Sequence, residues 1–204
     1  MTICHGIPWY RNGADDHCPF IIEGWWLFFY PLSYLTLTKE RIRERIEEKE
    51  LDKEKKIVRQ TYLSDASRKE NDAEHAWHAA VMAVLLSEYA NENIDVLKTV
   101  TMILLHDVVE IDAGDTYAYD EDGKKTQRLR EEYAAQRIYG LLPEDQRQKF
   151  SLLWEEFEEA KTAEAKFARA MDHVQPLLLN NSNDGADWRE HQVTAEQVYG
   201  RQSK

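Results

Sequence analysis

Residues 104–116 read LLHDVVEIDAGDT, and this stretch carries the polar groups around which the chain is organised. His106 and Asp107 are adjacent at the end of an apolar run, and Glu110 follows four residues after His106. On a helix, these spacings put the three side chains on neighbouring positions of one face. Such groups are costly to bury alone, and a divalent metal ion suits an imidazole and several carboxylates together. The stretch therefore indicates a metal site at a helix end.

The end of this helix is expected at Gly114, because glycine favours the position just past a helix C-terminus. Asp115 then lies immediately beyond the helix. The alternative interpretation is an ordinary helix end whose acidic side chains are solvated. The rest of the chain has to decide between the two interpretations.

The composition is typical of one folded domain, with 204 residues of which 43% are hydrophobic. The formal net charge of −12 argues against nucleic acid or an anionic membrane surface as a partner. A small phosphorylated ligand stays compatible, since it needs only a few local cations or a metal. Cys4 and Cys18 are the only cysteines, which is too few for a disulfide framework, so we expect a cytoplasmic protein.

Residues 1–37 differ from the rest and hold both cysteines and three of the six tryptophans. Residues 20–37 are nearly all apolar, but a signal peptide would need a basic start and a small-residue cleavage site. As a membrane span the segment is marginal in length and contains Glu23 and Pro31. A third interpretation is that it is not native coding sequence. We expect the folded domain to comprise residues 38–204, and we assign no role to the segment before it.

Apolar periodicity after residue 38 predicts an all-α domain of six main helices, with no strand pattern. The polar loop at 117–125 is expected either to form a rim over a site or to be a plain surface connection. The expected helices are residues 39–58, 72–89, 95–111, 126–141, one that Pro143 opens, and 162–179, followed by a polar tail with a short helix at 194–199.

Two of the predicted helices carry apolar stripes at helical spacing, which we expect to be buried in the core. The stripe of the helix at 72–89 is Trp77, Val81, Val84, Leu85 and Tyr89, and the stripe of the helix after Pro143 is Phe150, Leu153, Trp154 and Phe157.

Candidate metal ligands come from three separate helices, in the order His, His-Asp, Asp. His75 lies near the start of one helix, His106 and Asp107 end the next, and Asp172 lies among apolar neighbours in the last long helix. An uncompensated buried carboxylate is disfavoured, so Asp172 is expected to meet a cation. His78, three residues after His75, is interpreted as supporting the site or as a capping or core group.

The sequence contexts of these residues resemble the HD-domain phosphohydrolases, with the closest likeness to the 5′-deoxynucleotidases and their eukaryotic relatives. The segments that carry the resemblance are RKENDAEHAWH at 68–78, LLHDVVEIDAGDT at 104–116 and AKFARAMDHVQPLLL at 165–179. The likeness runs from about residue 38 to about residue 197. It implies an all-helical fold with a metal held between helices.

The resemblance also implies roles for single residues. Glu110 and Asp115 match acids beside the metal that activate water or hold a second, weaker Mg²⁺. Arg59 and Arg68 lie in segments that the family uses near the phosphate and sugar. The residues that match the family's metal ligands are His75, His106, Asp107 and Asp172.

One position departs from the family. Its bacterial enzymes tend to carry an aromatic residue after the arginine of the first helix, whereas Gln60 follows Arg59 here. This difference leaves open how deoxyribose and ribose are distinguished.

The expected function is a metal-dependent 5′-nucleotidase that converts (deoxy)ribonucleoside 5′-monophosphates to nucleoside and phosphate, using Mn, Co, Fe, Ni or Zn. One alternative is an HD phosphohydrolase that acts on a cyclic nucleotide, an alarmone or a nucleoside triphosphate. Another is a non-catalytic helical scaffold that keeps a metal for structure, although such a site has no need for Glu110 and Asp115. The resemblance further implies a homodimer, and neither nucleic acid nor a membrane is expected as a partner.

Overall fold

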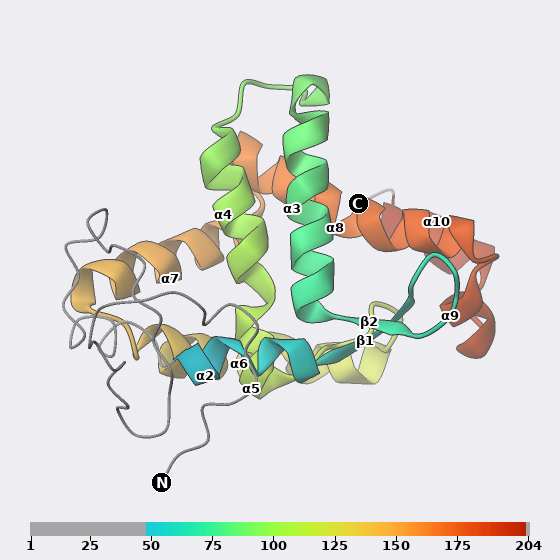
Figure 1. Ribbon diagram of the computed structural model, residues 1–204, viewed down its shortest axis with the longest axis horizontal. Helices are drawn as coiled ribbons and strands as arrows, with labels where there is room; N and C mark the ends of the chain where they lie inside the picture. The colour runs from blue at the N-terminus through green and yellow to red at the C-terminus, as the bar shows by residue number, and fades with distance from the viewer. Residues whose placement is uncertain (1–47, 203–204) are drawn as a thin grey trace, which may run out of the picture. The chain divides into compact units, whose positions relative to one another are not determined.

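Helices dominate the computed structural model, which describes residues 48–202 (Figure 1). Helices α3 (Asp72–Leu86) and α4 (Val96–His106) lie side by side, and α8 (Ala163–Ser182) packs against both. Helix α7 (Glu144–Glu159) contacts α4, α8 and α6 (Glu121–Tyr139). The predicted all-α class is confirmed by this arrangement.

The smaller elements connect and close the long helices. A two-stranded hairpin precedes α3, and a short 3₁₀ turn joins α4 to the one-turn helix α5. These elements are α2 (Glu48–Leu51), η2 (Glu54–Lys56), β1 (Val58–Tyr62), β2 (Lys69–Asn71), η3 (Ser87–Tyr89), η4 (Asp107–Val109), α5 (Glu110–Ala113), α9 (Ala186–Glu190) and α10 (Ala195–Gln202).

The hairpin corrects the prediction that this part of the chain has no strands. Strands β1 and β2 are antiparallel, with Val58 opposite Asn71 and Tyr62 opposite Lys69. The segment VRQTY contains the β-branched and aromatic residues that suit a strand, but five residues give a weak periodic signal. The Asn183 side chain donates to the main-chain carbonyl of Leu63 at 3.1 Å, which ties the end of β1 to the end of α8.

The helix predicted at 39–58 is also corrected, since its described part contains only α2 and η2 before the strand begins. Its first residues lie outside the described part of the chain, as does all of segment 1–37. No helix between residues 48 and 202 is long and apolar enough to cross a membrane.

Helix α3 begins where the sequence predicts, because Asn71 and Glu74 form a reciprocal capping box. The prediction of which face of α3 is buried, however, is wrong. The face that packs against α4 and α8 consists mainly of alanines, whereas Trp77 is 64% exposed and Leu85 68% exposed. Periodicity identifies the two faces of a helix but does not decide which one the neighbouring helices cover. The buried residues of α3 are Asp72, His75, Ala76, Ala79, Ala80, Met82 and Ala83.

The later helices agree well with prediction. Gly114 ends α5 with φ of 73°, the backbone region that glycine favours. Helix α6 begins five residues earlier than expected, since the Asp120 side chain accepts from the main-chain N–H groups of Asp122 and Gly123. In α7, Leu153, Trp154 and Phe157 are buried and Phe150 packs beside them, which confirms the predicted core stripe.

Candidate metal centre

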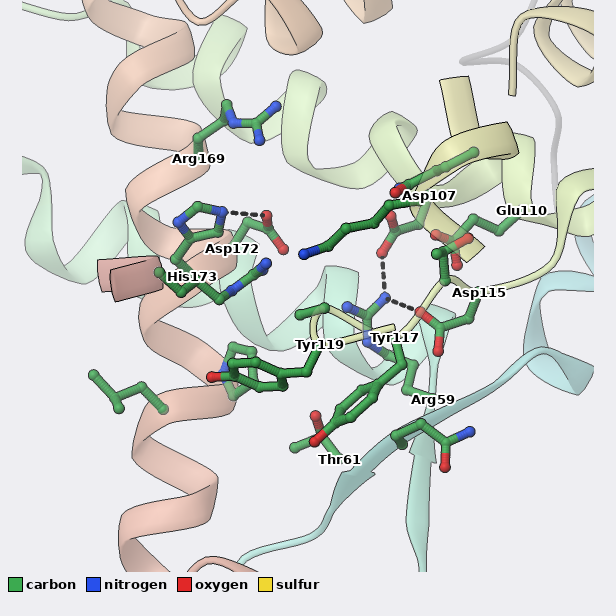
Figure 2. Close-up of a pocket in the computed structure, with 18 of the residues that line it drawn as sticks. Arg59, Thr61, Asp107, Glu110, Asp115, Tyr117, Tyr119, Arg169, Asp172 and His173 are labelled. Carbon is green, nitrogen blue, oxygen red and sulfur yellow. Dashed lines mark hydrogen bonds and ion pairs between the residues drawn. The ribbon is translucent and has the colours of Figure 1, made fainter. Parts of the chain in front are cut away.

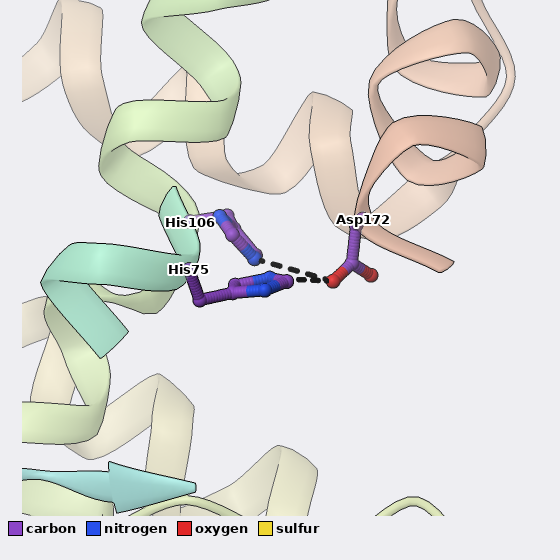
Figure 3. A group of neighbouring side chains, drawn as sticks. All are labelled: His75, His106 and Asp172. Carbon is purple, nitrogen blue, oxygen red and sulfur yellow. Dashed lines mark hydrogen bonds and ion pairs between the residues drawn. The ribbon is translucent and has the colours of Figure 1, made fainter. Parts of the chain in front are cut away.

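Three predicted ligands from three helices converge on one point (Figure 3). His75 comes from α3, His106 ends α4, and Asp172 comes from α8. The Nε2 atoms of His75 and His106 lie 3.0 Å and 3.7 Å from Asp172 Oδ1. Both imidazoles are buried, so the group faces inward rather than into bulk solvent.

The fourth predicted ligand, Asp107, lies beside this group. Its Oδ1 is 3.0 Å from His106 Nε2, and its Oδ2 is 3.8 Å from His75 Nε2. Asp107 belongs to the 3₁₀ turn η4, so the helix tightens between His106 and Glu110 instead of continuing evenly. The structure therefore brings all four predicted ligands together.

The hydrogen bonds of His106 show which ring nitrogen faces the site. Its Nδ1 donates to the main-chain carbonyl of Ile103 at 2.6 Å, so Nε2 is the ring nitrogen that faces the carboxylates. This Nε2 lies 3.0 Å from Asp107 Oδ1 and 3.7 Å from Asp172 Oδ1. Positive charge is needed between these atoms, either a proton on Nε2 or a metal ion in its place, so the donor set fits a divalent metal ion.

The surrounding charges also favour a cation. Burial alone would lower the pKa of His106, but Asp107 and Asp172 outweigh it and hold the pKa well above its ordinary value. Burial would raise the pKa of Asp172, yet the two imidazoles hold it well below its ordinary value. Positive charge at this point is therefore strongly stabilised.

A second group of acids lies next to the first. One oxygen each from Asp72, Glu110 and Asp115 lies within 4.8 Å of the others. Burial raises the pKa of Asp72 to about 8 and that of Glu110 well above its ordinary value, and Asp107 adds to both shifts. The sequence indicated Glu110 and Asp115 but gave Asp72 no role, although its position three residues before His75 places it on a neighbouring part of the same helix face.

Arg59 lies between the two groups of carboxylates (Figure 2). Its Nη1 is 2.8 Å from Asp107 Oδ2, 3.3 Å from Asp72 Oδ1 and 3.9 Å from Asp115 Oδ1. Burial opposes its charge, but these acids hold the guanidinium pKa well above its ordinary value. Strand β1 carries Arg59, so the hairpin that sequence analysis missed positions this cation.

These groups open into a cavity of about 280 Å³. Tyr117 and Tyr119 line it, so the part of the predicted loop that precedes α6 forms a rim over the site, whereas residues 121–125 belong to α6 (Figure 2). The Tyr117 hydroxyl donates to Asp187 at 3.1 Å, which fixes the rim to α9. The cavity also contains the cationic side chains of Lys124 and Arg169, to which the sequence gave no role. Helix periodicity gives no signal for which surface cations face a distant site.

Arg68 does not lie with these residues. Its side chain is 55% exposed and contacts Glu74 at 2.7 Å, so it supports the start of α3. It is not among the residues that line the cavity.

Comparison with known protein families supports the assignment of this cluster as a metal site. A family profile described as HD domain matches residues 51–204. This chain belongs to the HD-domain family.

Relatives of this HD-domain protein include curated enzymes and a solved structure. It is 34% identical over 114 residues to 5′-deoxynucleotidase HDDC2 from Homo sapiens, covering 56% of this chain and 54% of that protein. The match to the Bos taurus protein of the same name is 32% identical over 114 residues, with 56% and 54% covered. The chain thus spans about half the length of the curated relatives it matches.

Among solved structures, a predicted metal-dependent phosphohydrolase from Magnetospirillum magnetotacticum MS-1 is 51% identical, with a TM-score of 0.71 and 74% and 76% of the two chains covered. A conserved hypothetical protein from Pyrococcus furiosus is 20% identical, with a TM-score of 0.51 and 76% and 92% covered. The second likeness supports the fold alone.

Proposed function

We propose that this HD-domain protein is a metal-dependent phosphohydrolase that converts nucleoside 5′-monophosphates to nucleoside and phosphate. The observation that carries the proposal is the convergence of His75, His106, Asp107 and Asp172 beside buried acids and Arg59, at the wall of one cavity. The curated relatives that bear the name 5′-deoxynucleotidase support this class of substrate.

The four convergent residues would hold one divalent cation, with Mn, Co, Fe, Ni or Zn as candidates. When bound, such a cation acidifies a water molecule and polarises a phosphoryl group. Glu110 is buried close to Asp107, and its raised pKa suits a group that accepts and returns a proton. Asp115 either protonates the leaving alkoxide or, with Asp72, holds a second and weaker Mg²⁺.

The phosphate of the substrate would meet the cationic side chains of the cavity. Arg59 already faces Asp107 and is buried, so it offers a fixed charge close to the ligands. Lys124 and Arg169 line the same cavity from α6 and α8. These cations offset the negative charge of a phosphate in an acidic protein, and they replace Arg68 in the substrate-binding role.

Gln60 is the residue where the sugar preference is decided. Its side-chain oxygen lies 2.7 Å from Lys69 Nζ and 3.1 Å from His191 Nε2, and Gln60 lines the cavity. We propose that both ribose and deoxyribose are accepted, because a hydrogen-bonded amide excludes a 2′-hydroxyl less strictly than a packed aromatic ring.

The test is phosphate release from a panel of nucleotides, with several divalent metals and with metal content measured on the same samples. The panel contains deoxy- and ribonucleoside monophosphates, a cyclic nucleotide, an alarmone and a triphosphate. Preference for the monophosphates is expected. Preference for another member moves the protein to that substrate class, and metal binding without any turnover supports the non-catalytic scaffold.

Single-residue variants distinguish residues that bind the metal from residues that contribute to turnover. We expect Asp107→Ala to lose metal, whereas Glu110→Gln keeps it and slows kcat by roughly 10²–10⁴-fold. Asp112→Asn is the matched control, since Asp112 lies on the same helix α5 but pairs with Arg137. Wild-type kcat with full metal in Glu110→Gln would remove this residue from the catalytic site.

We further propose that the protein is a cytoplasmic homodimer. Trp77, Val81, Val84 and Leu85 form an exposed apolar stripe on α3, and such contiguous patches mark interaction surfaces. A second copy of the chain can cover the same stripe around a two-fold axis. Light scattering after size exclusion should give a dimer for the wild type and a monomer for Trp77→Glu/Leu85→Glu. A monomeric wild type would rule the dimer out.

A further inference from the structure

Gln175 is a fully buried polar residue one helical turn from Asp172 on α8, and the reaction scheme above leaves it without a role. Its side-chain oxygen lies 2.8 Å from Nδ1 of His75, the ring nitrogen on the far side from the metal centre. Its side-chain nitrogen donates to Glu70 Oε2 at 2.9 Å and lies 3.1 Å from His78 Nδ1. A buried amide with three partners at one metal-site histidine calls for an explanation.

The orientation of the Gln175 amide follows from its partners. The amide nitrogen lies within hydrogen-bond distance of two possible acceptors, Oε2 of the buried Glu70 and Nδ1 of His78, so the amide NH₂ group faces them. The opposite orientation would place the amide oxygen 2.9 Å from Glu70 Oε2. The amide oxygen is thereby left facing His75 Nδ1, which must carry the proton.

We infer that Gln175, oriented by Glu70 and His78, is a positioning residue that fixes His75 in the Nδ1–H tautomer and presents its Nε2 lone pair to the metal. The inference rests on the proposed function insofar as it requires a metal at His75. It parallels His106, whose Nδ1 donates to the main-chain carbonyl of Ile103. Partners of this kind set the ring orientation and basicity of histidine ligands.

In this arrangement, His78 and Glu70 both orient the Gln175 amide. Burial lowers the pKa of His78, which keeps this imidazole neutral and its Nδ1 free to accept from the amide. Glu70 Oε1 has no hydrogen-bond partner and lies 4.0 Å from Arg59 Nε. Glu70 therefore accepts from Gln175 with Oε2 and faces the Arg59 side chain with Oε1.

The first test is the tautomer of His75, read from ¹⁵N NMR of the histidine-labelled full chain at pH 8, metal-free and Zn²⁺-loaded. We expect Nδ1 to carry a proton in both states, and in the metal-free protein Asp172 can hold a second proton on Nε2. A metal-free His75 without a proton on Nδ1 would overturn the inference.

The second test is the affinity for Co²⁺, measured by calorimetry and by the visible absorption spectrum of the bound ion. Gln175→Met keeps length and volume but removes the amide, and it should weaken Co²⁺ binding by about 10–100-fold and change the spectrum. Glu70→Gln should have a smaller effect of the same sign. Thr99→Val is the matched control, because Thr99 is fully buried yet its hydroxyl donates to the main-chain carbonyl of Asp95, the N-cap of α4, away from the metal centre.

The tautomer and the Co²⁺ measurements decide the positioning role without a hydrolysis assay. Wild-type Co²⁺ affinity and spectrum in Gln175→Met would overturn the positioning role. If Gln175→Met does not fold, Glu70→Gln and the wild-type tautomer decide the question. If Gln175→Met binds Co²⁺ more weakly but the wild type hydrolyses no nucleotide of the panel above, the proposed function is overturned and this inference stands.

Discussion

Replacing Arg59 with methionine removes a buried cation that faces several carboxyl groups. The Arg59 side chain is 14% exposed, and its Nη1 lies 2.8 Å from Asp107 Oδ2. Methionine keeps most of the side-chain length and apolar stem but none of the charge. The carboxyl groups left without this cation are those of Asp107, Asp72, Asp115 and Glu70.

The stability that Arg59→Met is expected to lose depends mainly on the ion pair with Asp107. Burial opposes its ionisation, but His106 and Arg59 outweigh burial and lower its pKa to about 2, so it is ionised at neutral pH. Burial raises the pKa of Asp72 to about 8, so this neighbour is largely neutral there. Breaking one buried ion pair costs about 3–5 kcal/mol of unfolding free energy. With about 2–4 °C per kcal/mol for a protein of this size, Tm should fall by about 6–20 °C.

Thermal melts of the full chain, followed by circular dichroism with EDTA or with Mn²⁺, measure this loss. Mn²⁺ at a hundredfold excess over Kd stabilises a protein by about 2.7 kcal/mol. At one fixed Mn²⁺ concentration the gain should be larger in Arg59→Met than in the wild type, because the metal then neutralises carboxylates that lack their arginine and binds with a lower Kd. Arg147→Met is the control, since Arg147 pairs only with exposed Glu144 and its loss should leave Tm unchanged. A Tm for Arg59→Met in EDTA equal to that of the control would refute the reasoning.

Three further predictions concern catalysis, pH and the N-terminal segment. Asp115→Asn should lower kcat by roughly 10²-fold, and partial recovery in excess Mg²⁺ would assign it to a second cation rather than the leaving group. Burial raises the pKa of Glu54 from 4.5 to about 7, so the wild type loses stability as pH rises through that range. Glu54→Gln escapes this loss and should be about 1–2 kcal/mol more stable than wild type at pH 8.5, with no difference at pH 4, by urea denaturation. Removing residues 1–37 should leave nucleotide hydrolysis and solubility unchanged, and aggregation of the chain that starts at Thr38 would show that the segment belongs to the fold.

Much of the fold could be predicted because its signals are local. The capping residues of α3 and α4, the glycine that ends α5 and the aromatic stripe of α7 each act within one or two helical turns. The four candidate ligands were also predicted, from their order on three helices and from the resemblance of their sequence contexts to the HD-domain phosphohydrolases. The β-hairpin escaped prediction, since a short strand is defined by its partner rather than by its own periodicity.

The sequence by itself therefore determined most of the long helices, their order and the residue types that can hold a metal, but not the hairpin in place of the end of the helix predicted at 39–58. Only the tertiary structure decided which face of α3 is covered, since Ala-rich packing against α4 and α8 leaves Trp77 and Leu85 exposed. It also decided that Arg59 enters the site while Arg68 stays outside, and that Asp72 and Gln175 join it. The physical reason is that ion pairs and hydrogen bonds depend on the distances between side chains from different helices and strands. The spacing of residues along the sequence does not specify those distances.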